Sequence, residues 1–173
     1  METRAEVRRV PRRGHADVST GVGVLDHLLR LLADSAPFEL ALEVEPGAPD
    51  QEVAAAGRAL GEVLAPLLRE DDSAGRGWAI LPADEALATV ALEVTDRPLV
   101  VSNVDLTDQR VGGLGTDLMA RFLDALAHGA RLNLHVRLLE GRDPEHVLDA
   151  IFKALGAALG VAGRPVEHLR ERE

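Results

Sequence analysis

The chain has 173 residues, 46% of them hydrophobic, which is enough for one domain with a substantial core. Its net charge of −10 argues against nucleic acid or an anionic membrane as a partner, and no apolar stretch reaches the roughly 18 residues of a membrane-spanning helix. The absence of cysteine excludes disulfides, thiolate metal sites and a cysteine nucleophile, so we expect a cytoplasmic protein.

Helical and strand patterns alternate along the chain. Apolar positions spaced i, i+3, i+4 and i+7 predict helices, and period-two alternation predicts strands. In chain order we expect strands at 7–10 and 16–19, a helix at 25–32, a strand at 38–44, a helix at 53–67, strands at 89–94 and 99–104, a helix at 118–126, a strand at 132–138 and a helix at 147–159. Glycine, proline and acidic residues predict loops at 46–50, 70–77 and 112–115, and residues 163–173 are typical of a solvated tail.

The order helix, strand, helix occurs twice, which indicates an internal duplication. The clearest matches are three pairs at offsets of 91, 94 and 95 residues: Asp26 with Asp117, Leu40 with Leu134, and Gly61 with Gly156. About one turn added to the third helix, and one residue in a loop, would explain the drift. We therefore predict a single α/β (α+β) domain over residues 1–173. Its two similar half-domains, about 16–70 and 99–160, are each expected to be a β-sheet covered by two helices.

The segment GRDPEHVLDAIFKAL places polar residues at the start of the fourth helix. Pro144 suits the first helical turn, with Asp143 as the N-cap. His146 and Asp149, at i and i+3, lie on one helix face, the spacing by which a helix offers two ligands to one metal ion. Acidic residues such as Glu145 are also expected in a first turn because of the helix dipole, so capping is an alternative explanation.

Near the first helix, His27 follows Asp26, a candidate N-cap residue, and could be a metal ligand or an ordinary, partly buried histidine. The preceding Gly21-Val22-Gly23 lacks the residues of a phosphate-binding or dinucleotide-binding loop and predicts a turn.

Four further charged residues stand out. Asp84 and Glu85 precede a strand, where they could supply a general base or form a solvated turn. Arg97 precedes a proline at a strand start, where it could bind a phosphate through two parallel hydrogen bonds or form a salt bridge. Lys153, the only lysine, lies one turn after Asp149 and could form an exposed helix ion pair with it.

Taken together, these segments resemble the imidazoleglycerol-phosphate dehydratase family, in the right order over nearly the whole chain. The resemblance rests on Glu2-Thr3, DVSTGVGVLDHLLRLL, RGWAILPADEALATVALEVTDRPLV and VRLLEGRDPEHVLDAIFKALGAAL. It implies two similar α/β half-domains and a lyase of histidine biosynthesis that removes water from imidazole glycerol phosphate. It also implies two manganese ions, held by histidine and glutamate between subunits.

The positions that the resemblance assigns to phosphate binding and acid–base chemistry are retained. Arg76, Arg97 and Lys153 fall at implied phosphate contacts, and Glu85 and Glu2 at implied catalytic, substrate-facing carboxylates. The family's C-terminal Pro-Ser-Thr-Lys-Gly segment, another phosphate contact, has no counterpart in GRPVEHLRERE.

Most of the implied metal ligands are replaced. The family's His-His-Thr-Val-Glu-Asp segment falls at residues 50–55, which read DQEVAA, and Arg121 stands at a histidine position of the third helix. The residual metal set is His27, Glu145, His146 and Asp149, in which Glu145 replaces a histidine and Asp149 a glutamate. Carboxylates suit manganese, so the residual set could form a single weak site.

Three functional hypotheses follow. The first is a dehydratase-like protein without metal-dependent activity and without a bound cofactor, which keeps a pocket for a phosphorylated small molecule. The second is an active dehydratase with a remodelled manganese site that uses Glu145 as a ligand. The third is a structural partner that assembles with an intact dehydratase. We expect a homo-oligomer, a trimer or larger, that binds neither nucleic acid nor membrane.

Overall fold

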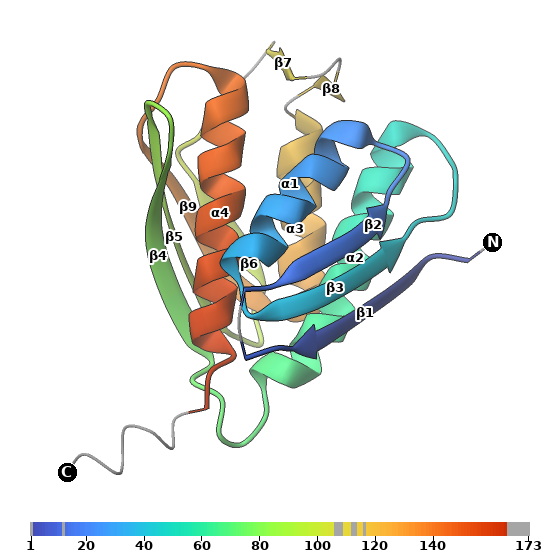
Figure 1. Cartoon of the computed structure of the whole chain (residues 1–173), viewed down its shortest axis with the longest axis vertical. Helices are drawn as coiled ribbons and strands as arrows, with labels where there is room; N and C mark the ends of the chain where they lie inside the picture. The colour runs from blue at the N-terminus through green and yellow to red at the C-terminus, as the bar shows by residue number, and fades with distance from the viewer. Residues whose placement is uncertain (1, 12, 106–108, 112–113, 116, 166–173) are drawn as a thin grey trace.

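The structure, a computed structural model, describes residues 2–11, 13–105, 109–111, 114–115 and 117–165. A layer of helices lies between two β-sheets (Figure 1). The helices in the described residues are α1 (Gly23–Ser35), α2 (Pro49–Leu68), α3 (Asp117–Ala130) and α4 (Pro144–Ala162). The strands are β1 (Arg4–Arg9), β2 (His15–Ser19), β3 (Phe38–Glu43), β4 (Arg76–Ala83), β5 (Ala86–Val94), β6 (Leu99–Ser102), β7 (Arg110–Val111), β8 (Leu114–Gly115) and β9 (Leu132–Glu140).

The two large sheets share one topology. In the first sheet the strand order is β1-β3-β2, with β1 antiparallel and β2 parallel to β3. In the second sheet the order is β4-β5-β9-β6, with β5 antiparallel and β6 parallel to β9. The second sheet therefore repeats the first and adds β4 beside β5 as an edge strand. Helices α1 and α2 pack on the first sheet, and α3 and α4 on the second. The predicted α/β architecture of two similar halves is confirmed.

Burial fixes the alignment of the two halves. The buried positions of α1 recur in α3 at a constant offset of 94 residues, from Leu25 and Met119 to Ala33 and Ala127. Strands β3 and β9 keep this offset, and α2 and α4 align at 95. The predicted match of Asp26 with Asp117 is wrong, because Asp26 aligns with Ala120. The two aspartates share a residue type but not a position on the buried face of the helix, and that position determines which residues are equivalent.

Equivalent glycines allow the second helix of each half to pack closely against the first helix of the other half. A Cβ atom on Gly61 of α2 would lie 2.6 Å from the carbonyl oxygen of Leu126 on α3. A Cβ atom on Gly156 of α4 would overlap the carbonyl oxygen of Leu32 on α1. Leu32 and Leu126 are themselves equivalent at the offset of 94. The duplication thus produces two matched helix pairs, α1–α4 and α2–α3.

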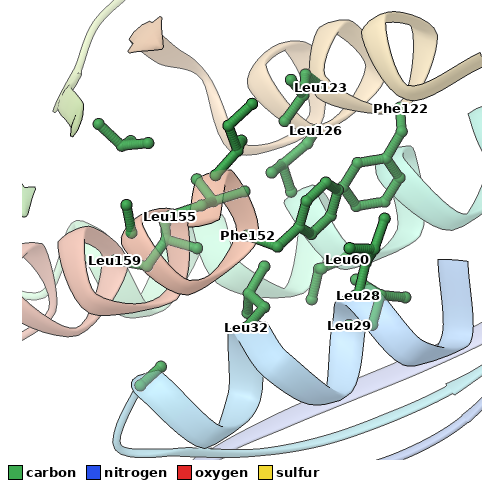
Figure 2. Close-up of a cluster of buried hydrophobic side chains, with 14 of the residues drawn as sticks. Leu28, Leu29, Leu32, Leu60, Phe122, Leu123, Leu126, Phe152, Leu155 and Leu159 are labelled. Atoms are coloured by element: carbon green, nitrogen blue, oxygen red, sulfur yellow. The ribbon is translucent and has the colours of Figure 1, made fainter. Parts of the chain in front are cut away.

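Leucine, valine and alanine fill the core, with two phenylalanine rings at its centre (Figure 2). Phe122 of α3 and Phe152 of α4 are fully buried, with ring centroids 5.5 Å apart and planes inclined by 32°. This tilted geometry is favourable for an aromatic pair. No helix in the described part of the chain is long and apolar enough to cross a membrane.

Arg9, at the end of β1, joins the C-terminal ends of α2 and α4. Its Nη2 donates hydrogen bonds to the carbonyl oxygens of Leu67 (3.0 Å) and Gly163 (2.6 Å), and to the hydroxyl of Ser73 (3.2 Å). Its Nη1 donates to Glu70. A single guanidinium therefore satisfies backbone carbonyls that two helices leave free at their ends.

Several predicted boundaries differ from the structure. Strand β4 was not predicted, because Pro82 is typical of a strand edge rather than its centre, and it begins at Arg76, inside the predicted loop at 70–77. Helix α2 begins at Pro49, inside the predicted loop at 46–50. The segment 112–115 contributes β8, although residues 112 and 113 lie outside the described residues. Most of the predicted tail also lies outside them, but the amide of Ala74 donates to the carbonyl of Arg164 at its start.

Candidate functional site

The start of α4 is bound to the turn between β4 and β5. Asp143 is the N-cap, as predicted, and its carboxylate accepts from the amide of Glu145 at 2.9 Å. The carboxylate of Glu85, in the turn, accepts from the amides of Asp143 (2.9 Å) and Arg142 (3.3 Å). Asp84 adopts a left-handed conformation (φ 51°), which is typical of a two-residue hairpin turn. The turn and the helix start therefore form one polar unit rather than a freely solvated loop.

His146 lies between the two carboxylates of this turn. Its Nδ1 is 2.6 Å from Oε2 of Glu85, and its Nε2 is 3.4 Å from Oδ2 of Asp84. The imidazole is one-third exposed and the Glu85 side chain is 42% exposed, so solvent reaches the pair. The turn is thus exposed to solvent, as one of the two interpretations of the sequence predicts, and both of its carboxylates also lie near the imidazole of His146.

The hydrogen bonds of this unit shift the pKa values of both Glu85 and His146. The amide of Asp143 and the imidazole of His146 lower the pKa of Glu85 to about 2. The hydrogen bond to Glu85 raises the pKa of His146, with further support from the charges of Asp143 and Asp84. The unit therefore favours a carboxylate beside an imidazolium.

His27 connects α1 to α4 on the same side of the molecule. Its Nε2 lies 3.1 Å from Oδ1 of Asp149. Asp26 is not the N-cap of α1, which is Val22; instead its carboxylate accepts from the amide and hydroxyl of Thr20. The sequence brought His27 and Asp149 into one candidate set, and the structure brings them into contact.

Lys153 does not pair with Asp149, contrary to the structural alternative considered from the sequence. Its ammonium donates a hydrogen bond to the carbonyl oxygen of Pro82 at 2.6 Å. Because Pro82 lies at the end of β4, just before Asp84 and Glu85, the lysine faces the same turn as His146.

Of the residual metal set, His27, His146 and Asp149 are engaged with other side chains, whereas the Glu145 side chain is exposed. No three histidine, aspartate or glutamate side chains among the described residues converge closely enough to hold a metal ion. The donor types in this set nevertheless suit manganese. We name this group the α1–α4 half-site: His27, Glu145, His146 and Asp149.

Internal symmetry defines an equivalent α2–α3 half-site. At the offsets of 94 and 95, its members are Arg121, Asp50, Gln51 and Ala54. Its helix pair is connected by Nη1 of Arg121 and Oδ2 of Asp50, 3.5 Å apart. Guanidinium and alanine donate no electron pair to a metal, so this set does not fit manganese.

The remaining predicted residues lie elsewhere. Arg76 begins β4, and at about 3.3 Å per residue it lies about 20 Å along the strand from Pro82, the partner of Lys153. Arg97 follows β5 at the end of the sheet where Arg76 lies, and is exposed. Glu2 precedes β1 in the other sheet, where it is exposed. One chain therefore does not gather the three predicted phosphate-binding cations.

Sequence reasoning missed the contacts of His146 with Asp84 and Glu85 and the contact of Asp50 with Arg121. All of them join residues more than 60 positions apart, and no local motif indicates them. An alignment of the two halves on buried positions would have shown that Arg121 is equivalent to His27.

Comparisons with known proteins agree with this architecture. The sequence model of the family described as imidazoleglycerol-phosphate dehydratase matches residues 20–159. An imidazoleglycerol-phosphate dehydratase of Desulforudis audaxviator is 39% identical over 93% of this chain and 90% of its own length. One from Roseiflexus sp. is 40% identical over 90% of this chain and 80% of its own length.

Solved structures give the same result. The dehydratase of Staphylococcus aureus superposes with a TM-score of 0.83 at 29% identity, covering 92% of each chain. The enzyme of Pyrococcus furiosus, in complex with (S)-C348, superposes with a TM-score of 0.82 at 29% identity, covering 95% of this chain and 90% of its own.

Proposed function

This chain belongs to the imidazoleglycerol-phosphate dehydratase family of histidine biosynthesis, and from that premise we propose that it binds a phosphorylated small molecule without metal-dependent dehydration. The observation that carries the proposal is the state of the two half-sites. Only His27 and His146 supply imidazole among their eight positions, and both contact carboxylates of the same chain. Metal binding requires a neutral imidazole with a free electron pair.

The test is an assay of imidazole glycerol phosphate dehydration with manganese in excess. We expect no turnover above a blank that contains a heat-denatured sample. Sustained turnover in a preparation free of host dehydratase would contradict the proposal.

The binding part of the proposal rests on Lys153, Arg97 and Arg76. Because these cations are not gathered in one chain, a phosphate that contacts all of them would lie between subunits. Charge-assisted hydrogen bonds to phosphate are typically worth about 1.5–3 kcal/mol, so Lys153→Met and Arg97→Met should each weaken binding about 10- to 100-fold. Calorimetric titration with imidazole glycerol phosphate measures this effect.

Arg30→Gln is the matched control, because Arg30 is an exposed arginine on α1 outside the proposed site. Equal weakening by the control would show that only net charge matters. No binding by the unaltered protein would remove this part of the proposal.

A second candidate function, an active dehydratase with a remodelled manganese site, is favoured by one observation. Among the described residues, the Glu145 side chain makes no hydrogen bond or ion pair, so it is free to act as a ligand. Under this alternative Glu145→Ala abolishes turnover, whereas the charge-neutral Glu145→Gln keeps the helix start and tests the ligand role alone.

We further propose a cytoplasmic homo-oligomer, a trimer or larger. Loss of metal ligands that would join subunits favours a trimer over a large cubic particle. Light scattering in chelator should give a mass near three subunits, and a 24-subunit particle would contradict this.

A further inference from the structure

The α2–α3 half-site contains a cation of its own. Nη1 of Arg121, on α3, lies 3.5 Å from Oδ2 of Asp50 at the start of α2. Both side chains are about half exposed, so the contact lies at the surface end of the helix pair. Asp50 lies in the first turn of α2, where the helix dipole favours an acidic residue.

The position equivalent to Arg121 also contacts a carboxylate in the other helix pair. His27, equivalent to Arg121, lies 3.1 Å from Asp149 of α4. In both pairs, therefore, a nitrogen base on the first helix of a half faces a carboxylate on the second helix of the other half. The contacting carboxylate differs, since Asp50 is equivalent to Glu145 and Ala54 to Asp149.

The two nitrogen bases differ in what they can bind. A neutral imidazole offers an electron pair to a metal ion, whereas a guanidinium stays protonated and offers none. Asp50 is the only charged oxygen ligand of the α2–α3 set, and Arg121 already faces it. Gln51 adds one weak amide oxygen, and Ala54 adds nothing.

We propose that Arg121 is the resident cation of the α2–α3 half-site, where its guanidinium takes the place of a divalent metal ion and connects α3 to α2. The chain then takes up no divalent ion at this half-site, and any uptake is confined to the α1–α4 half-site. This inference goes beyond the proposed function, because it assigns a structural role to residues outside the proposed phosphate-binding set.

Metal content measured on the purified oligomer tests the inference. Wild type, Asp50→Asn and Arg121→Gln are dialysed against manganese, desalted and analysed for manganese per subunit. We expect the same content in all three, whatever its value. Asp149→Asn is the matched control in the other half-site. A lower content in Asp50→Asn than in wild type would make Asp50 a metal ligand and overturn the inference.

A double-mutant cycle in chelator tests the ion pair itself. The thermal midpoint is measured for wild type, Asp50→Asn, Arg121→Gln and the double variant. An exposed pair should give a coupling of about 1–3 °C that shrinks in 1 M salt. Additive shifts, with no coupling at low salt, would overturn the inference. Dehydratase turnover would contradict the proposed function but leave both of these readouts unchanged, so the two failures are distinguishable.

Discussion

The two helix pairs share a close glycine contact and a set of buried leucines, whereas the residues at their exposed ends differ. Gly61 and Gly156 approach equivalent carbonyl oxygens, and equivalent leucines line both interfaces. At the exposed ends, by contrast, α1–α4 is joined by an imidazole and a carboxylate, and α2–α3 by a guanidinium and a carboxylate. Close packing tolerates little change in volume, whereas a surface contact of either kind costs little. Since the duplication, the close helix packing has therefore been kept, whereas the polar residues at the exposed ends have changed.

The largest expected effect concerns a place where the buried contacts themselves differ. Phe152 of α4 is equivalent to Gly57 of α2, whose Cβ would lie 2.6 Å from the carbonyl oxygen of Phe122. In the α2–α3 pair the two backbones approach each other and close this space, whereas in the α1–α4 pair the ring of Phe152 fills it. Phe152→Ala should lower the free energy of unfolding by about 4 kcal/mol because it leaves a cavity. Urea denaturation measures this, and Phe152→Leu should recover more than half of the loss.

The glycine contacts test whether the two interfaces are equally tight. Gly61→Ala and Gly156→Ala should each cost about 2–3 kcal/mol, because an added methyl meets backbone atoms that cannot move without shifting a helix. Gly23→Ala is the control, since nothing lies within 4 Å of its added Cβ. If either variant were as stable as the Gly23→Ala control, that interface would be looser than described.

The helix starts offer a smaller, reciprocal test. Asp143 caps α4, whereas its equivalent, Ala48, precedes α2 without a side-chain cap. Asp143→Ala should cost about 1 kcal/mol, and Ala48→Asp should gain up to about 1 kcal/mol. Opposite signs in urea denaturation would support the alignment of the two helices, and equal signs would contradict it.

The smallest expected effect is electrostatic and confined to the α4 start. Because Glu85 raises the pKa of His146, Glu85→Gln should return that pKa toward its ordinary value, which NMR titration of the imidazole measures. A raised pKa stabilises the fold below the ordinary histidine value, and this contribution is lost as pH rises through the folded pKa. The stability difference between wild type and Glu85→Gln should therefore be larger at pH 5.5 than at pH 9.

The lowered pKa of Glu85 adds stability that is present above its ordinary value near 4.5 and lost as pH falls toward about 2. The difference between wild type and Glu85→Gln should accordingly shrink in strong acid. A difference that does not change between pH 2 and pH 9 would contradict the assigned pair.

The helices were predictable because their apolar periodicity is strong, and the N-cap Asp143 was predictable because Pro144 follows it. The edge strand β4 was not predictable, because Pro82 interrupts its strand pattern and a single sequence does not show which strand it pairs with. At the candidate site, the local spacing places His146 and Asp149 on one helix face, but each side chain contacts a different partner. The contacts of Glu85 with His146 and of Asp50 with Arg121 depend on how distant elements dock, which no local spacing reports.

The contacts of Arg9 imply an order of assembly. Its guanidinium belongs to the first strand, yet one of its acceptors, the carbonyl of Gly163, lies 154 residues later. During synthesis on the ribosome, the N-terminal half emerges before that acceptor exists, so the Arg9 guanidinium at the end of its strand still lacks one of its hydrogen-bond acceptors. Contacts this distant in sequence form late in folding, because the entropy cost of closing the long loop comes before the stabilisation that the contact provides. Although the two halves look like copies, the first cannot complete its structure until the last helix of the second has been made.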